Sequence, residues 1–250
     1  MKDISVGLQL YTVRDQLAQD FKRTVQRVAE MGYTAIEFAG YGNLMSREIA
    51  ALLADTGLRA AGTHVSFMAL EQDIERELNY CLDIGCSYLV MPSLPPEYRS
   101  ANGIRTLASR LNRAGQRCRQ RGISLVYHNH AFEFEQDETG EEYLLDILLR
   151  ETEPDLVKLE FDIYWAAFAD VDPAAYLQQY PERIPLIHLK DMASDRTFTE
   201  VGDGTLDITA ICAAALKSGT RFFLVENDQP HIPSLESARR SLENLTSMLE

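Results

Sequence analysis

Residues 20–38 read DFKRTVQRVAEMGYTAIEF, and this stretch contains the unit from which the chain is built. From Asp20 onward the pattern is that of an amphipathic helix, which ends at Gly32. Glycine is favoured at this place because the residue after a helix commonly needs a positive φ. The apolar run over residues 34–38 is typical of a strand that is buried on both faces. The stretch therefore predicts a helix followed directly by a buried strand.

The same unit recurs along the chain, and Gly57, Gly85, Gly122 and Gly219 each end an expected helix just before an apolar run. We expect strands over residues 4–10, 34–38, 58–64, 88–91, 123–128, 156–162, 184–189 and 222–226. We expect helices over residues 20–32, 46–57 with Ser46 as the cap, up to 85, 102–121, 143–151, from 173, 207–217 and 235–249. Strands that alternate with helices pair in parallel through right-handed crossovers. Eight such units in 250 residues predict an α/β protein with one (β/α)₈ TIM barrel over residues 1–250.

A doubly wound open sheet is the alternative architecture for the same alternation. Such a sheet normally carries a glycine-rich loop after its first strand, where a nucleotide binds. Here the first expected strand ends in QLYT at residues 9–12, which contains no glycine. The barrel is therefore favoured.

Composition narrows the function classes. The formal net charge of −14 opposes a nucleic-acid partner and makes a strongly anionic substrate less natural. No apolar run approaches 18 residues, so no membrane span is expected, and Lys2 and Asp3 lead into the first strand without a secretory signal. We expect a cytoplasmic protein with reduced, mostly buried cysteines at positions 81, 86, 118 and 212.

Polar side chains stand at or just beyond the ends of the expected strands, where catalytic groups lie in such a barrel. They are Glu37, His64, His128, His130, Glu133, Asp162, His188, Lys190 and Glu226. Residues two apart on a strand face the same way, so His188 and Lys190 share a direction. An isolated carboxylate is expensive to bury, but several that converge on one cation offset that cost. We assign no role to Glu37 or to Glu160.

Four of these residues, Glu133, Asp162, His188 and Glu226, offer three carboxylates and one imidazole. This set suits one divalent ion such as Mn²⁺, Mg²⁺, Co²⁺ or Zn²⁺, whereas a structural zinc site would favour thiolates. Each residue also has an ordinary structural explanation, such as a helix cap for Asp162 or a core histidine for His188. Those explanations would have to hold at all the strand ends together.

The chain resembles the sugar phosphate isomerase/epimerase family of xylose isomerase-like TIM barrels over nearly its whole length. The matching motifs are GLQLY at residues 7–11, GYTAIE at 32–37, YHNHAFEF at 127–134, DIYW at 162–165, HLKD at 188–191 and GDG at 202–204. The motif at 127–134 resembles a branch that includes inosose dehydratases and enzymes that act on 3-keto glycosides. The resemblance implies a metal held by Glu133, Asp162, His188 and Glu226. Many relatives have their first ligand where this chain has His128, so His128 or His130 is an alternative to Glu133.

This ligand set favours proton abstraction from a carbon next to a sugar carbonyl, through an enediolate. Glu226 and Glu133, or a histidine of strand five in place of Glu133, would flank that carbon as base and acid, which allows isomerisation or epimerisation. A leaving group on the neighbouring carbon would turn the same chemistry into β-elimination, on inososes or 3-keto glycosides. We expect a small uncharged carbohydrate bound by His64, His128, His130, Lys190 and Trp165, whose ring suits a sugar face.

Two other classes of protein remain as rivals. A metal-dependent endonuclease for abasic DNA shares this kind of barrel, but it would need more histidines than the five present and a basic groove. A catalytically inactive barrel that serves as a binding module would have lost its polar strand ends. The sequence leaves the formation of a homo-oligomer open.

Overall fold

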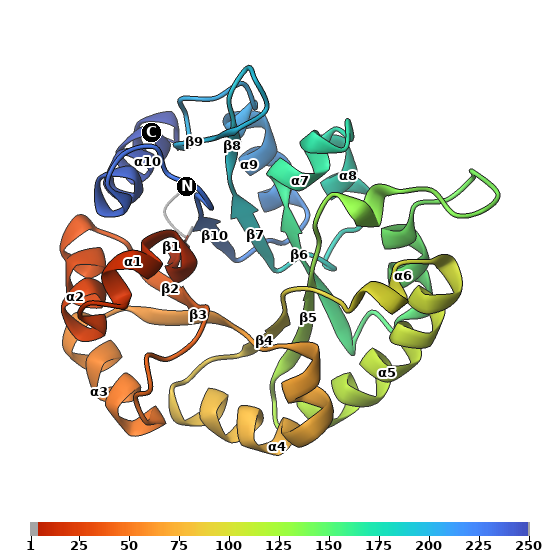
Figure 1. Ribbon diagram of the computed structural model, residues 1–250, viewed down its shortest axis with the longest axis horizontal. Coiled ribbons are helices and arrows are strands. Elements are labelled where there is room, and N and C mark those ends of the chain that lie inside the picture. Colours follow the sequence, from red (N-terminus) through yellow and green to blue (C-terminus); the bar gives the residue numbers. More distant parts are fainter. Residues whose placement is uncertain (1–4, 250) are drawn as a thin grey trace.

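A computed structural model describes residues 5–249, in which eight parallel strands close into a barrel (Figure 1). The barrel order is β1-β10-β7-β6-β5-β4-β3-β2, so the last strand in the chain pairs with the first. The strands are β1 (Ser5–Gln9), β2 (Ala35–Phe38), β3 (Arg59–His64), β4 (Tyr88–Met91), β5 (Ser124–His128), β6 (Val157–Asp162), β7 (Leu186–Leu189) and β10 (Phe222–Val225). This confirms the predicted barrel and excludes the open sheet. Ile4, expected in the first strand, lies outside the described residues.

The helices surround the barrel. They are α2 (Phe21–Met31), α3 (Ser46–Thr56), α4 (Phe67–Asp83), α5 (Ala101–Gln120), α6 (Leu144–Glu151), α8 (Pro173–Gln179), α9 (Ile208–Lys217) and α10 (Ser234–Leu249). Gly32 ends α2 with a φ of 106°, as its place in the sequence predicts. The expected cap of α3 is displaced by one residue, because Met45 is the capping position and Ser46 opens the helix. The Glu48 carboxylate accepts the Met45 backbone N–H at 3.0 Å instead.

Several short elements were not expected. They are the 3₁₀ turns η1 (Leu10–Val13), η2 (Pro96–Tyr98) and η3 (Phe132–Phe134), the helices α1 (Arg14–Leu17) and α7 (Ile163–Phe168), and a small hairpin of β8 (Asp191–Met192) and β9 (Phe198–Thr199). All of them follow β1, β4, β5, β6 or β7, at the end of the barrel where the polar strand ends lie. They are too short for a periodic pattern to reveal.

Two apolar layers hold the fold together. The larger layer fills the space between the strands and the helices. The smaller one lies inside the barrel and consists of Ala35, Ala61, Tyr88, Val90, Val126, Leu186 and Leu224. Above it, toward the C-terminal strand ends, the interior becomes polar.

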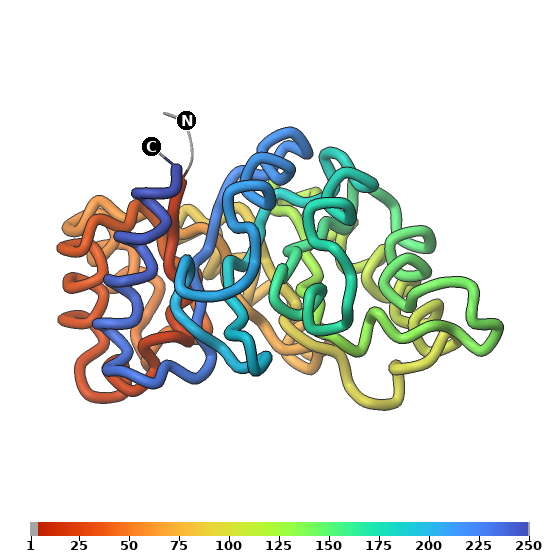
Figure 2. The backbone as a smooth tube through the Cα atoms, turned by 90° about the horizontal axis from the view of Figure 1, so that it is seen from above, coloured from red at the N-terminus to blue at the C-terminus, as the bar shows by residue number. Residues whose placement is uncertain are grey.

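The first and last described elements of the chain lie on one side of the molecule. Helix α10 lies alongside the first helices and completes the ring (Figure 2). The Tyr33 hydroxyl donates to the Ala238 carbonyl oxygen at 2.7 Å and ties this helix to the start of β2. No helix among residues 5–249 is long and apolar enough to span a membrane.

Candidate functional site

Four side chains from four strand ends converge at the C-terminal end of the barrel. His128 ends β5, Asp162 ends β6, His188 lies in β7 and Glu226 directly follows β10. Their nitrogen and oxygen donors lie within 4.8 Å of one another, and all four residues are buried. These neighbouring strands are in register, with Asp162 beside His188 and His188 beside Leu224. Pleating therefore turns all four side chains into the same space.

The donor atoms of this group lie close enough together to share one cation. His188 Nδ1 lies 2.6 Å from Glu226 Oε2 and 3.1 Å from His128 Nε2. His128 Nε2 lies 3.4 Å from Asp162 Oδ2. Asp162 Oδ2 and Glu226 Oε2 are buried and accept no hydrogen bond of good geometry. Two imidazoles and two carboxylates whose buried oxygens lack a hydrogen-bond donor are suitable ligands for one divalent cation of intermediate hardness.

The structure does not bring Glu133 into this group. Tyr127 points out of the barrel, opposite to His128, and its hydroxyl donates to Glu133 Oε1 at 2.5 Å. The His130 backbone N–H donates to Glu133 Oε2 at 2.8 Å. Both carboxylate oxygens are thus occupied outside the barrel, in the turn η3. Of the alternatives that the sequence left open for strand five, only His128 meets the other three donors.

Lys190 and Asp228 adjoin the same carboxylates. Lys190 Nζ lies 3.1 Å from Asp162 Oδ2, 2.9 Å from Glu226 Oε2 and 2.9 Å from Asp228 Oδ2. Sequence reasoning missed Asp228, although it stands two residues after Glu226. The same rule of alternation that paired His188 with Lys190 would have found it.

Charge in this upper group shifts several pKa values. Burial lowers the pKa of the Lys190 ammonium, but Asp162, Glu226 and Asp228 outweigh burial and raise it well above its ordinary value. Burial raises the pKa of Asp162, but Lys190 and His128 outweigh it and hold it at about 2. Burial and the charge of Glu226 raise the pKa of Asp228 to about 7. The group therefore contains ionised carboxylates beside one carboxyl that exchanges its proton near neutral pH.

A second polar group lies deeper in the barrel and touches the other side of His188. His188 Nε2 lies 2.7 Å from Glu37 Oε2 and 3.3 Å from Glu160 Oε2. His64 Nε2 lies 3.1 Å and 3.0 Å from the same two oxygens. The Gln9 amide donates to Glu37 Oε2 at 2.8 Å. Carboxylates in this position orient a ligating imidazole and fix its tautomer.

The histidines differ in their protonation. Burial lowers the pKa of His64, but the charges of Glu37 and Glu160 outweigh it and raise it to about 9. Burial and the charge of His188 lower the pKa of His128 to about 4. Burial lowers the pKa of His130 to about 3. His128 and His130 are therefore neutral at physiological pH, the form that binds metals or accepts protons.

A cavity of about 420 Å³ opens above the upper group. Its lining includes all the residues that the sequence predicts to bind substrate, namely His64, His128, His130, Trp165 and Lys190. His130 Nδ1 and Trp165 Nε1 are buried without a hydrogen-bonding partner. Arg14 also lines the cavity, but its guanidinium donates to the backbone oxygens of Tyr11 and Asp228, each at 2.9 Å.

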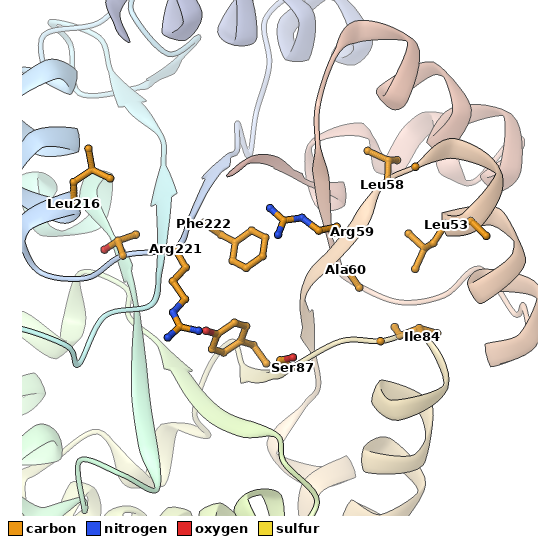
Figure 3. Close-up of a pocket in the computed structure, with 14 residues that line it drawn as sticks. Leu53, Leu58, Arg59, Ala60, Ile84, Ser87, Leu216, Arg221 and Phe222 are labelled. Carbon is orange, nitrogen blue, oxygen red and sulfur yellow. The ribbon is translucent and has the colours of Figure 1, made fainter. Parts of the chain in front are cut away.

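A larger cavity, of about 990 Å³, lies at the opposite end of the barrel (Figure 3). Its walls carry Arg59, Arg221, Tyr88 and Phe222, and the Arg59 guanidinium lies 5.0 Å from the Phe222 ring centre. No histidine, cysteine or carboxylate is among its lining residues within the described part of the chain. The titratable groups suited to chemistry therefore line the smaller cavity.

Comparison with known proteins agrees with this geometry. Residues 25–248 match the model of the xylose isomerase-like TIM barrel family. The chain belongs to this family. An inosose dehydratase from Geobacillus kaustophilus is 29% identical over 260 residues, which covers 86% of this chain and 82% of that protein. The predicted resemblance is thereby confirmed.

Solved xylose isomerase-like barrels superpose closely on this chain. A sugar phosphate isomerase/epimerase from Parabacteroides distasonis gives a TM-score of 0.85 at 26% identity and covers 99% of this chain and 96% of its own. The IOLI protein, solved with a bound zinc atom, gives 0.77 at 12% identity and covers 98% of both chains. At 12% identity, the similarity to the IOLI protein shows only that the two chains share a fold.

Proposed function

We propose that this xylose isomerase-like barrel is a divalent-metal-dependent lyase that removes water from a polyhydroxylated cyclic ketone of the inosose type. The observation that carries the proposal is the convergence of His128, Asp162, His188 and Glu226 beneath a cavity, with Lys190 and Asp228 beside them. The likeness to inosose dehydratase supports this substrate class.

The metal would be held by the two imidazoles and two carboxylates of the upper group. When bound, a divalent cation supplies Lewis acidity that polarises a substrate carbonyl. Glu226 takes the proton from the carbon next to that carbonyl, because it is an ionised carboxylate at the cavity wall. Glu37 contacts His188 Nε2 at 2.7 Å and holds the imidazole with its Nδ1 toward the upper group, where it would bind the metal.

Elimination needs a group that protonates the departing hydroxyl. Asp228 lines the cavity next to Glu226, and its raised pKa of about 7 suits this task. The hydroxyl on the β-carbon leaves with the proton of Asp228 as water, while a double bond forms toward the carbon that Glu226 deprotonates. Lys190 holds both carboxylates in position.

The cavity favours an uncharged ring. Lys190 is paired with three carboxylates and Arg14 with two backbone oxygens, so neither cation of the cavity wall remains for a phosphate. Trp165 offers an aromatic face to the ring, and the unpartnered nitrogens of His130 and Trp165 suit its hydroxyls. This agrees with the expectation of a small uncharged carbohydrate.

The sequence favoured isomerisation or epimerisation over elimination, and that stays a prediction. Epimerisation needs acid and base on opposite faces of one carbon. Glu133 lies outside the barrel, which leaves a strand-five histidine as the partner of Glu226 in that reaction. We rank elimination first because Asp228 lies in the cavity wall with Glu226 and because the chain is similar to inosose dehydratases. Both reactions share the abstraction of a proton next to a carbonyl, so one assay separates them.

The test is to incubate metal-loaded protein with an inosose in D₂O and follow the products by NMR and mass spectrometry. Loss of water supports the proposal, whereas an epimer or deuterium exchange without dehydration favours the isomerase. Glu226→Gln should lower kcat/KM by about 10²–10⁴-fold, and Glu138→Gln, in an exposed loop, should change nothing. A fully active Glu226→Gln enzyme would reject the assigned base.

A further inference from the structure

The deeper polar group has the composition of a metal site in its own right. Glu37 Oε2, His64 Nε2, Glu160 Oε2 and His188 Nε2 lie within 4.8 Å of one another. Four contacts among these atoms measure 2.7, 3.0, 3.1 and 3.3 Å. Ligand atoms that each lie about 2.0 Å from a tetrahedral ion are about 3.3 Å from one another. The four donor atoms would therefore need to move apart only slightly to hold such an ion.

The two carboxylates of the deeper group are fully buried. Glu37 and Glu160 are both 0% exposed. Within residues 5–249, the only ionisable partners of these carboxylates are the two imidazoles, and no ammonium or guanidinium pairs with either. Burying a carboxylate is costly unless a cation or hydrogen-bond donors partner it, and one divalent cation at this place would partner both.

The strands make room for these carboxylates. A Cβ at Gly62 would lie 2.2 Å from Glu37 Oε1, so glycine leaves the space that this oxygen fills. The pairing of β2 with β3 shifts register between Ile36 and Glu37, beside Gly62. Glu37 Oε1 and Glu160 Oε1 are buried without any hydrogen-bonding partner. One carboxylate would be enough to orient His188. This group contains two, and each has one buried oxygen that accepts no hydrogen bond.

We propose that Glu37, His64 and Glu160 bind a second divalent cation inside the barrel, beneath the upper group, with His188 between the two ions. His188 would face the upper ion through Nδ1 and the lower one through Nε2. Its Nε2 proton is then released to solvent, as binding to a protonated ligand requires. The site shares His188 with the upper group but needs no substrate, so it is tested apart from the reaction proposed above.

Metal content is the direct test. The full chain is stripped with a chelator, dialysed against Zn²⁺ or Mn²⁺, and its bound metal is measured. We expect two ions per chain in the wild type, one in Glu160→Gln, one in Asp162→Asn, and two in the control Glu138→Gln. One ion in the wild type that Glu160→Gln retains would overturn the proposal.

A crystal of the wild type in Mn²⁺ gives a second readout that does not depend on the folding of a variant. An anomalous peak between Glu37, His64 and Glu160 is the expected result. A single peak among His128, Asp162 and Glu226 would overturn the second site. Because neither measurement uses substrate, a lack of dehydratase activity would leave this result unaffected.

Discussion

At the scale of single residues, Glu133 belongs to the motif that predicted a metal ligand, but its side chain does not reach the other predicted ligands. Its carboxylate accepts from the Tyr127 hydroxyl and the His130 backbone N–H, outside the barrel. A Gln side chain can satisfy both partners if its amide donates to the Tyr127 oxygen. We therefore expect Glu133→Gln to bind as much metal as the wild type. Loss of metal in this variant would restore Glu133 to the ligand set.

The same variant should change how stability depends on pH. Burial raises the pKa of Glu133 from 4.5 to about 7. Between these values the folded state keeps a proton that the unfolded state has released, so the free energy of unfolding falls as pH rises through this window. Glu133→Gln has no carboxyl group to titrate, so its free energy of unfolding does not fall with pH in this way. Relative to the wild type, the variant should gain up to about 3 kcal/mol between pH 5 and pH 8, measured by urea unfolding. Parallel pH profiles would contradict this.

Residue types at strand ends predicted much of the candidate site, because parallel strands bring their carboxyl ends to one edge. Asp162, His188, Glu226 and the strand-five alternative His128 meet as the sequence placed them. The choice between His128 and Glu133 was beyond the sequence, because it depends on the turn η3 that folds Glu133 back onto Tyr127. A turn of three residues leaves no periodic signal.

At the scale of elements, helix-ending glycines and apolar runs predicted the eight strands. They did not predict the polar side chains inside the barrel. Glu37 and Glu160 lie in the middle of the barrel, where continuous apolar runs predict a dry core. Only the closed barrel, with β6 beside β7 and β2 beside β3, brings them to His64 and His188. Two further contacts, of His64 with Glu160 and of His188 with Glu37, join residues 96 and 151 positions apart, and no local pattern encodes them.

Gly62 in β3 tests this arrangement. Gly62→Ala would place a Cβ 2.2 Å from Glu37 Oε1 and push that carboxylate away from His188. We expect a loss of about 1–3 kcal/mol in the free energy of unfolding and a metal affinity weaker by about 10–100-fold. Gly7→Ala in β1 is the matched control, because its Cβ would meet the Leu224 side chain and the Ala35 backbone carbonyl but neither carboxylate of the deeper group. Equal metal affinity in the two variants would show that the position of Glu37 does not affect metal binding.

At the scale of the whole molecule, the proposed ligands bind the barrel together, because they come from β5, β6, β7 and the residue after β10. The folded barrel assembles these groups and the unfolded chain does not, so bound metal stabilises the fold. A free metal concentration of 1,000 times Kd contributes about 4 kcal/mol, or about 8–16 °C in Tm for a chain of this length. Chelation should lower the Tm of the wild type and of Glu138→Gln by this amount in thermal scans. Asp162→Asn should lose the part of the metal-dependent shift that the upper ion contributes. A wild-type Tm that does not depend on metal would contradict a cation in the upper group.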